Sequence, residues 1–260
     1  MKYKLTLLFA AAIFILSCSK KDPDENMNPC SPLILVTKVS GMKHESNGSV
    51  SPVNMIFSYE YGRPIQITDG LKTTKFFYDS SINSVYKVEH TDSAASPVKR
   101  TLFQALNISD AGPIQVNEFH YEGNQLTFES VNDYTYTDGL VSKLQKTSDN
   151  IVLTQKYTWK DGNMITFDNG KGTVYRYKYN DKLNPFVNRF TRYQTGPVDF
   201  TSANLVTEIE EVTDGVSKIS TMTYTYNPDG YPLTARSVNQ EGTVTLYLTF
   251  EYQEFKSPCY

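Results

Sequence analysis

The chain has 260 residues, with 25 lysines and arginines against 28 aspartates and glutamates, and its formal net charge is −3 at pH 7. Nucleic-acid binding needs a clustered positive charge, and this composition has no basic excess, so we expect no nucleic-acid partner. The length suits one large domain or two small ones, and we favour one. Aromatic residues reach 13% of the chain, an amount that needs a wide buried surface.

The N-terminus has the layout of a secretory signal. Lys2 and Lys4 precede an almost wholly apolar run over residues 5–16, which ends at Ser17 and Cys18. Twelve residues in a helix cover about 18 Å, whereas the hydrocarbon core of a bilayer is roughly 30 Å thick. We therefore expect the run to be cleaved and not to remain as a transmembrane helix.

The residues before the first cysteine resemble the lipobox of bacterial lipoproteins. The match is Ile15-Leu16-Ser17-Cys18, with Ile15 in place of the usual leucine. This resemblance implies that residues 1–17 are the signal peptide and that Cys18 becomes the lipidated mature N-terminus. A plain signal peptide that ends near a cysteine is the alternative.

Residues 18–32 are expected to form the lipidated cysteine and a flexible tether. The stretch 19–26 is charged and has no apolar residue to bury, which is typical of a solvated linker. Its lysines and acidic residues also resemble the export signal of surface lipoproteins of the Bacteroidota. That resemblance implies an outer-membrane lipoprotein exposed at the cell surface, and an ordinary linker on the periplasmic face is the other interpretation.

Two cysteines remain once Cys18 carries lipid, namely Cys30 and Cys259. In an oxidising compartment such a pair is a candidate disulfide. The bond would close a loop of about 230 residues and contribute about 5 kcal/mol in the chain-entropy model. Two unpaired cysteines are the alternative, because only geometry decides whether the bond forms.

A short pattern recurs along the chain: an aromatic residue, a spacer, a second aromatic residue, a turn containing Asp, Asn or Gly, and a new apolar run. Alternation at period two with an Asp-Gly or Gly-Asn turn predicts a β-hairpin in each copy. The clearest copies lie at residues 57–65, 119–126, 134–140, 157–164, 175–181 and 224–233.

The alternation also assigns the two faces of each strand. Tyr175, Tyr177 and Tyr179 share one face, and Arg176 and Lys178 share the other. One packed and one wet face is typical of antiparallel sheet. We therefore predict an all-β fold over residues 33–260, an antiparallel meander of repeated hairpins curled into a barrel or half-barrel, with little helix.

Two stretches interrupt this rhythm, residues 92–116 and 186–212. Ser, Pro and Asn-Pro signals in them predict a long loop or a short helix, for example over residues 102–106.

The units at 57–65 and 224–233 resemble the YD (Rhs-type) repeat, whose core is an aromatic pair, an Asp or Asn, and a Gly-Arg-Leu step. Together with 179–186 and 202–206, they resemble a group of Bacteroidota lipoproteins of unknown function with degenerate YD-like hairpins. This resemblance implies no activity. The Gly-Arg step survives only at Gly62-Arg63, so the shell function of Rhs toxins is not implied.

Catalytic, metal and cofactor motifs are missing from the sequence. His44, His90 and His120 have no neighbours at ligand spacing, and we interpret each as a lone surface histidine. No Gly-x-Ser-x-Gly elbow occurs. The Asp-Gly pairs are explained by turns and not by calcium loops. We therefore expect no catalytic residue, no metal and no cofactor.

Two local patterns remain. Glu208, Glu210 and Glu211 are the densest carboxylates, and the neighbouring alternation indicates a solvated strand face. Asp92-Ser93-Ala94 resembles the O-glycosylation acceptor of Bacteroidota envelope proteins, which makes Ser93 a weak glycosylation candidate.

These observations favour a membrane-anchored envelope lipoprotein with a non-enzymatic binding or structural role and a protein or glycan ligand. Two alternatives stay open. One is a glycan-binding module that works with a nutrient-uptake system, and the other is a glycosidase-like enzyme, which needs only two carboxylates about 5 to 10 Å apart.

Overall fold

The computed structural model describes residues 33–45, 47–78, 85–109, 111–186 and 202–255. Within these ranges no helix is long and apolar enough to cross a membrane. Their regular elements are β-strands: β1 Leu33–His44, β2 Val50–Glu60, β3 Arg63–Asp69, β4 Lys72–Tyr78, β5 Val85–Asp92, β6 Lys99–Ser109, β7 Gly112–Glu122, β8 Gln125–Thr137, β9 Leu140–Ser148, β10 Ile151–Lys160, β11 Asn163–Asp168, β12 Thr173–Leu183, β13 Asn204–Thr213, β14 Val216–Tyr226, β15 Pro232–Asn239 and β16 Val244–Phe255.

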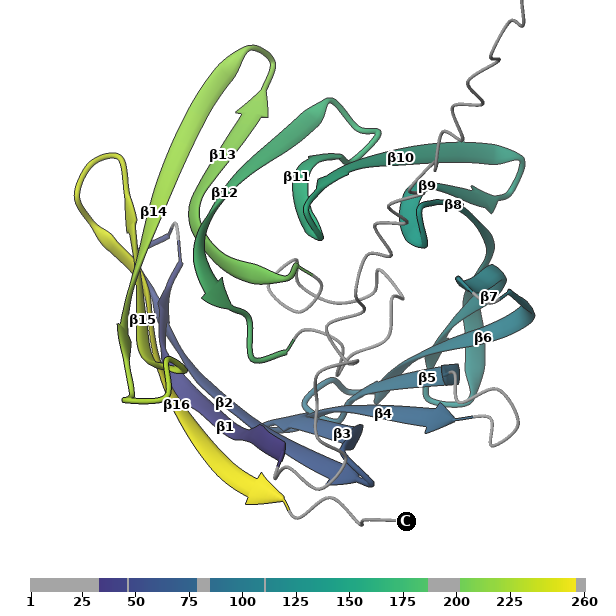
Figure 1. Cartoon of the computed structure of the whole chain (residues 1–260). Coiled ribbons are helices and arrows are strands. Elements are labelled where there is room, and N and C mark those ends of the chain that lie inside the picture. The colour runs from purple at the N-terminus through teal and green to yellow at the C-terminus, as the bar shows by residue number, and fades with distance from the viewer. Residues whose placement is uncertain (1–32, 46, 79–84, 110, 187–201, 256–260) are drawn as a thin grey trace, which may run out of the picture.

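Each strand pairs antiparallel with the next, and β16 pairs with β1, so the sheet closes into a barrel (Figure 1). The predicted meander of hairpins is confirmed, and the sheet is closed rather than open. Tight turns join many of the strands. Asp138 and Gly139, for example, have φ of 51° and 74°, which is the two-residue geometry that matches the twist of the flanking strands.

The seam between β1 and β16 joins the two ends of the described chain. Leu33 lies directly opposite Phe255 across it. Gly41 allows the strands to approach closely, because a Cβ added there would lie 1.8 Å from the carbonyl oxygen of Tyr247. A side chain at this position would therefore force the seam apart.

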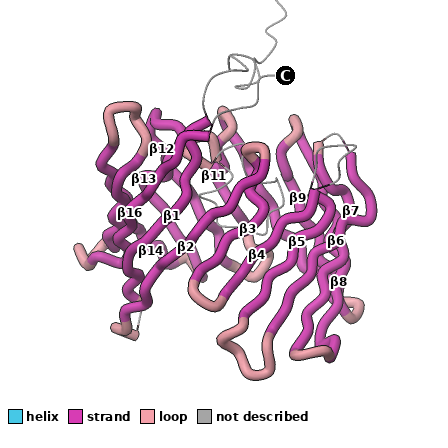
Figure 2. Tube along the Cα trace, turned by 90° about the horizontal axis from the view of Figure 1, so that it is seen from below, coloured by secondary structure: helices cyan, strands magenta, loops and turns pink. Residues whose placement is uncertain are grey.

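The barrel has two rims (Figure 2). At the terminal rim the odd-numbered strands begin and the even-numbered strands end, so Leu33 and Phe255 both lie there. At the opposite rim, the distal rim, the turns lead from odd-numbered to even-numbered strands.

A repeated contact joins the two strands of most hairpins that turn at the distal rim. Near the terminal rim an aromatic side chain of an even-numbered strand donates a hydrogen bond to a backbone carbonyl near the start of the preceding odd-numbered strand. The donor-to-acceptor distances are 2.6–2.8 Å, and the pairs are Tyr59–Val36, Tyr78–Pro64, Tyr136–Pro113, Trp159–Val141, Tyr179–Met164, Tyr224–Val206 and Tyr252–Pro232. Each bond satisfies a polar atom of a mostly buried ring.

One side chain identifies the inner face of the wall. Phe186 follows β12, yet its ring centroid lies 5.5 Å from that of Phe57 in β2 and 6.5 Å from that of Phe250 in β16. Because three strands separate β12 from β16 around the wall, this contact crosses the interior. Phe57 and Phe250 therefore face inward, and the residues that alternate with them face outward.

The buried residues follow this face around the barrel. The core contains Val39, Val88, Tyr177 and Met222, all of them less than a tenth exposed. The predicted division of β12 is confirmed, with Tyr177 buried and Arg176 and Lys178 exposed. The abundant aromatic residues thus largely serve the inner face.

The prediction of a loop or short helix at residues 102–106 is wrong. These residues belong to β6, which pairs with both β5 and β7 over most of its length. Phe103 faces inward opposite Val88, and Leu102 faces outward opposite Glu89. The prediction relied on the aromatic repeat, which is absent from β6. The second half of this strand runs Ala105-Leu106-Asn107-Ile108-Ser109, and it is a strand without that repeat.

The second interruption is only partly described. Residues 204–212 belong to β13, so the predicted loop or helix is wrong there, and residues 187–201 lie outside the described residues. Asn184 follows β12 and Ser202 precedes β13, and both are almost fully buried. The Asn184 amide donates to the carbonyl of Ser202 at 3.0 Å, and the hydroxyl of Tyr179 lies 2.9 Å from the Ser202 hydroxyl.

Candidate functional site

The inner face changes character between β4 and β9. Residues that lie directly opposite each other on neighbouring strands form rows across the wall. One row runs through Thr74, His90, Thr101 and His120 on β4 to β7. The next row towards the terminal rim contains Phe103, Glu118 and Ser130, and the one after it contains Val116, Asn132 and Lys146. We call the polar members of these rows the polar strip: Thr74, His90, Thr101, Glu118, His120, Ser130, Asn132 and Lys146.

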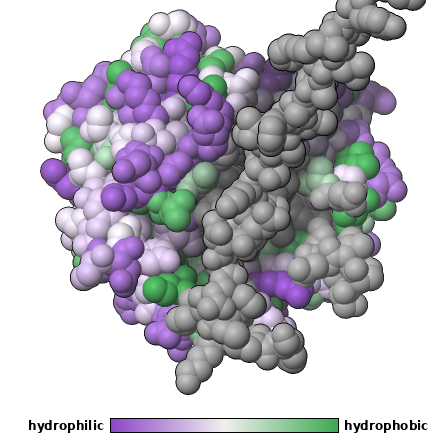
Figure 3. Space-filling view, in the orientation of Figure 1, coloured by the Kyte–Doolittle hydropathy of each residue, from purple (hydrophilic) through white to green (hydrophobic). Residues whose placement is uncertain are grey.

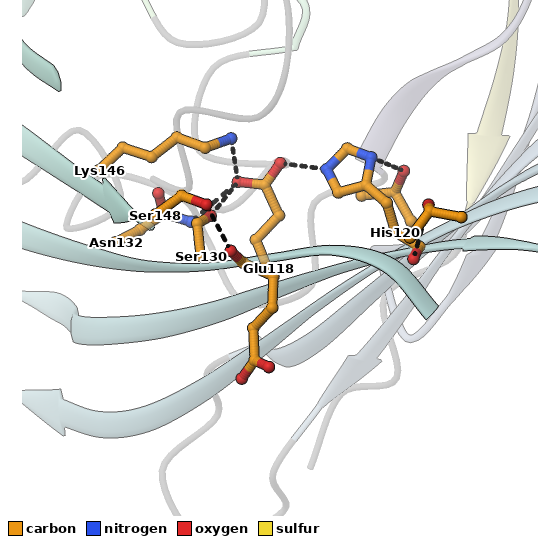
Figure 4. Close-up of polar contacts among 9 residues, drawn as sticks. Glu118, His120, Ser130, Asn132, Lys146 and Ser148 are labelled. Carbon is orange, nitrogen blue, oxygen red and sulfur yellow. Dashed lines mark hydrogen bonds and ion pairs between the residues drawn. The ribbon is translucent and has the colours of Figure 1, made fainter. Parts of the chain in front are cut away.

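Glu118 is the centre of the polar strip (Figure 4) and is 7% exposed. Its Oε1 lies 2.6 Å from Nε2 of His120, and its Oε2 lies 2.8 Å from Nζ of Lys146. The Asn132 amide donates to Oε2 at 3.0 Å, and the Ser130 hydroxyl does so at 3.4 Å. Three strands thus supply partners to one carboxylate.

These contacts determine the charge of Glu118. Burial alone raises the pKa of this carboxyl, but hydrogen bonds from Lys146, His120 and Asn132 outweigh burial and hold the pKa below its ordinary value. Glu118 is therefore an ionised acceptor at neutral pH. It is not the protonated acid that a general-acid mechanism needs.

His90 is in a different electrostatic state. Burial lowers its pKa, and the charge of Glu118 opposes this shift only in part. The ring is therefore neutral near pH 7, with one nitrogen a donor and the other an acceptor. Its Nδ1 lies 2.6 Å from the hydroxyl oxygen of Thr74, and its ring meets Phe103 edge-on.

Asn132 supplies an acceptor without a partner. The residue is 2% exposed, and its Oδ1 is the buried side-chain atom among the described residues that has no hydrogen-bond partner. The reversed amide orientation is excluded because it would place Oδ1 against the carboxylate of Glu118. Buried acceptors are nearly always satisfied by protein, water or ligand, so this atom indicates a place for a donor group.

A pocket of about 210 Å³ adjoins the polar strip towards the distal rim. Thr74, His90 and Thr101 line it together with the charged residues Lys72, Asp92 and Lys99. Thr101 connects the pocket to the carboxylate cluster, because its hydroxyl oxygen lies 3.4 Å from Nδ1 of His120. The pocket and the cluster therefore form one continuous polar surface on the inner face.

The outer face carries paired charges at mid-height beside exposed apolar side chains such as Ile56 and Ile219. Lys38 pairs with Glu251 across the seam at 2.8 Å, and Lys178 pairs with Glu208 at the same distance. Threonine hydroxyls also bond across neighbouring strands, as in Thr225 and Thr234. In the view of Figure 3 hydrophilic residues dominate much of the described surface, and hydrophobic ones are scattered.

The structure places some residues singled out from the sequence. His44 is exposed, as expected, but the interpretation of His90 and His120 as lone surface histidines is wrong, because both face inward with hydrogen-bond partners. The Thr74 partner of His90 lies on another strand, and His120 contacts Thr101 on β6 as well as Glu118 on its own strand, so spacing along the chain reveals only the last of these. Glu210 faces outward beside Arg176, as a solvated strand face requires.

The modification candidates keep the status of predictions. Cys18, Cys30 and Cys259 lie outside the described residues. The seam does bring Leu33 opposite Phe255, three residues after one cysteine and four before the other. Ser93 is exposed in the turn between β5 and β6 at the distal rim, a position accessible to a modifying enzyme.

No grouping of three or more potential metal ligands occurs among the described residues.

Sequence reasoning missed Glu118, Asn132 and Lys146. The alternation along the strands could have identified two of them. Glu118 and His120 lie an even number of positions from the buried Val116, and Asn132 lies two positions from the buried Tyr134, so all three are on the inward-facing side of their strands.

No protein-family model matches the sequence, and no curated protein matches it either. Among solved structures, a porin-like protein from Bacteroides vulgatus is similar with a TM-score of 0.51 and 14% identity, over 84% of this chain and 98% of that one. A porin-like protein from Bacteroides uniformis aligns over the same shares of the two chains with a TM-score of 0.35 and 12% identity. The first similarity shows a shared barrel fold.

Proposed function

We propose that this protein is a lipid-anchored envelope protein whose barrel stands in water and binds a ligand in its interior without catalysis. The observation that carries the proposal is the polar strip with its pocket, a continuous polar surface on the inner wall between β4 and β9. Polar groups on such a wall are costly unless they are satisfied. Asn132 Oδ1 is an acceptor that the wall leaves unsatisfied.

The outer face supports a barrel that stands in water. Barrels that span membranes present an apolar band outward, and a lysine or arginine at the bilayer midplane costs about 2–4 kcal/mol. Here Lys38, Lys178 and Arg176 lie on the middle parts of their strands and pair with outward-facing glutamates. A wall with these charges is stable in water and unfavourable in lipid.

The anchor supports the envelope location. A lipid on Cys18 and a tether over residues 18–32 would attach the barrel at the terminal rim, where Leu33 begins β1. The pocket lies towards the distal rim, beside Lys72, Asp92 and Lys99. The binding surface would then open away from the membrane. Attachment to the outer membrane fits this arrangement, with the barrel on the cell surface or on the periplasmic face.

The geometry favours binding over the glycosidase-like alternative. Retaining and inverting glycosidases need a protonated acid beside a second carboxylate. Glu118, the buried carboxylate of the polar strip, is held ionised by Lys146 and His120. Such a group orients partners and accepts hydrogen bonds.

A ligand screen tests this proposal. The mature chain with Cys18→Ala is heated with saccharides, amino acids, nucleosides and fatty acids, and the melting temperature is recorded. We expect at least one class to raise it, since a ligand at 100 times its Kd adds about 2.7 kcal/mol. Thr101→Val on the inner face should lower the affinity for that ligand at least fivefold, whereas Arg100→Gln on the outer face of the same strand should leave the affinity unchanged. Equal effects of the two variants, or no stabilising ligand at all, would contradict the proposal.

A further inference from the structure

The charges that line the polar surface are balanced in pairs. Lys146 lies 2.8 Å from Glu118, Lys99 lies 3.2 Å from Glu122, and Lys72 lies 3.9 Å from Asp92. In the register, Lys72, Asp92, Lys99 and Glu122 form one row of alternating sign along the distal rim. An anionic ligand would have to displace a carboxylate, and a cationic ligand would have to displace a lysine. The pairing therefore favours a ligand without net charge.

The remaining hydrogen-bonding groups are of mixed kind. Thr74 and His90 are bonded to each other through Nδ1, which leaves Nε2 of His90 to a ligand. The hydroxyls of Thr74 and Thr101 can both donate and accept. Carboxylates and phosphates need donors alone, and ammonium groups need acceptors alone. A hydroxyl group matches both kinds, because it donates one hydrogen bond and accepts two.

Aromatic rings lie among these polar groups. The ring of Phe103 meets His90 edge-on at 5.6 Å, and the ring of Phe128 meets His120 edge-on at 5.0 Å. Lys146 Nζ lies 5.1 Å from the centre of the Phe128 ring. Rings beside polar groups suit a ligand that has C–H faces as well as hydroxyl edges. The pocket volume of about 210 Å³ corresponds to roughly seven water volumes at about 30 Å³ each, which suits one sugar unit.

We propose that the pocket beside the polar strip binds a neutral polyhydroxylated ligand, a saccharide, with His90, Thr74 and Thr101 contacting its hydroxyls. This proposal rests on the proposed interior-binding function and names its ligand class. Glu118, Lys146 and His120 position Asn132 and each other.

The test is a calorimetric titration of the mature Cys18→Ala chain with a panel of neutral mono- and oligosaccharides, alongside acidic sugars, inorganic phosphate and polyamines. We expect a neutral saccharide to bind with an affinity that changes less than twofold between low and high salt, because no net charge is exchanged. An affinity that falls steeply with salt would overturn the assignment to a neutral ligand.

Paired variants locate the site. His90→Phe keeps a ring beside Phe103 but removes both nitrogens, and Thr74→Val keeps the shape of its side chain. Each should lower saccharide affinity at least tenfold while the protein stays folded by circular dichroism. Glu89→Gln, on the outer face of the same strand as His90, should leave the affinity unchanged. Saccharide binding that His90→Phe and Thr74→Val leave intact would overturn the assignment of these residues.

The screen separates the two proposals. If the panel fails but a fatty acid or a nucleoside binds and Thr101→Val weakens it, the saccharide assignment is wrong and interior binding stands. If no class of ligand binds, both proposals are wrong.

Discussion

The inner wall contains two neighbouring regions of opposite chemistry. On β10 to β12, Tyr157, Phe167 and Tyr175 stack with centroid separations of 5.0 and 5.8 Å and interplanar angles of 13° and 14°. On β7 to β9 the cross-strand neighbours are polar, with Glu118 opposite Ser130 and Asn132 opposite Lys146. The backbone is alike in both regions, so the difference lies in the side chains alone.

The aromatic stack finds its contacts within the wall. Burial raises the pKa of Tyr157, whose hydroxyl donates to Gln155, and its ring packs against Phe167. The polar strip is satisfied except at Asn132 Oδ1. The stack therefore stabilises the wall, whereas the strip is the region to which we assign the proposed binding.

The largest effect on stability is expected in the aromatic stack. Phe167→Ala removes the central ring of three and should lower the free energy of unfolding by about 3 kcal/mol, the lower end for a phenylalanine because Phe167 is only partly buried. Denaturant unfolding measures it. Saccharide affinity should change less than twofold, and its loss would show that the two regions are not separate.

A smaller loss of stability is expected in the polar strip. Glu118→Gln keeps the shape of the side chain but leaves Lys146 without its counter-charge, which should cost about 1–3 kcal/mol. Saccharide affinity should fall with it, since Glu118 holds His120, and His120 in turn contacts Thr101 of the pocket. The control is Glu129→Gln on the outer face of β8. Its free energy of unfolding is expected to lie within about 0.5 kcal/mol of that of the parent protein. If the control and Glu118→Gln behave alike, Glu118 is not the centre of the site.

The pH dependence of stability should report His90. Its pKa is lowered in the folded protein, so the unfolded chain binds the proton first as the pH falls below about 6.5. The free energy of unfolding should therefore decrease from pH 7 downwards until the folded-state pKa is passed. Burial of the ring and the charge of Glu118 set where that loss ends, and Asp92 and Lys99 line the same pocket. His90→Phe should make the melting temperature nearly independent of pH between pH 7 and 5.5. If the variant keeps the pH dependence of the parent, that dependence comes from other groups.

The smallest effect is expected on the outer face. Lys38→Met removes the partner of Glu251 in a solvent-exposed pair and should change the free energy of unfolding by no more than about 1 kcal/mol. Salt should reduce even this difference. A change of several kcal/mol would mean that this pair is shielded from water.

The sequence predicted the strands and their faces because alternation is local. Tyr175, Tyr177 and Tyr179 differ by two positions, and Asp138-Gly139 specifies a turn without help from distant residues. The closure of β1 on β16 was left open between a barrel and a half-barrel, because it joins residues more than 200 positions apart and depends on the twist summed over the whole sheet.

The polar strip was not predicted for the same reason. His120 finds Glu118 within its own strand, but Lys146 comes from β9, 28 positions away. Spacing rules search for ligands along one element, whereas this site is assembled across neighbouring strands. The signal that could have identified the site is the alternation along each strand, because these polar residues occupy positions that face inward.

The central claim is that this barrel stands in water with its binding surface inside. Sedimentation of the mature Cys18→Ala chain in detergent-free buffer tests it most directly, with circular dichroism to follow the strands. We predict a folded, soluble protein whose spectrum and melting temperature are unchanged by added detergent micelles. Aggregation without detergent, and recovery of the β-spectrum only in micelles, would contradict the account.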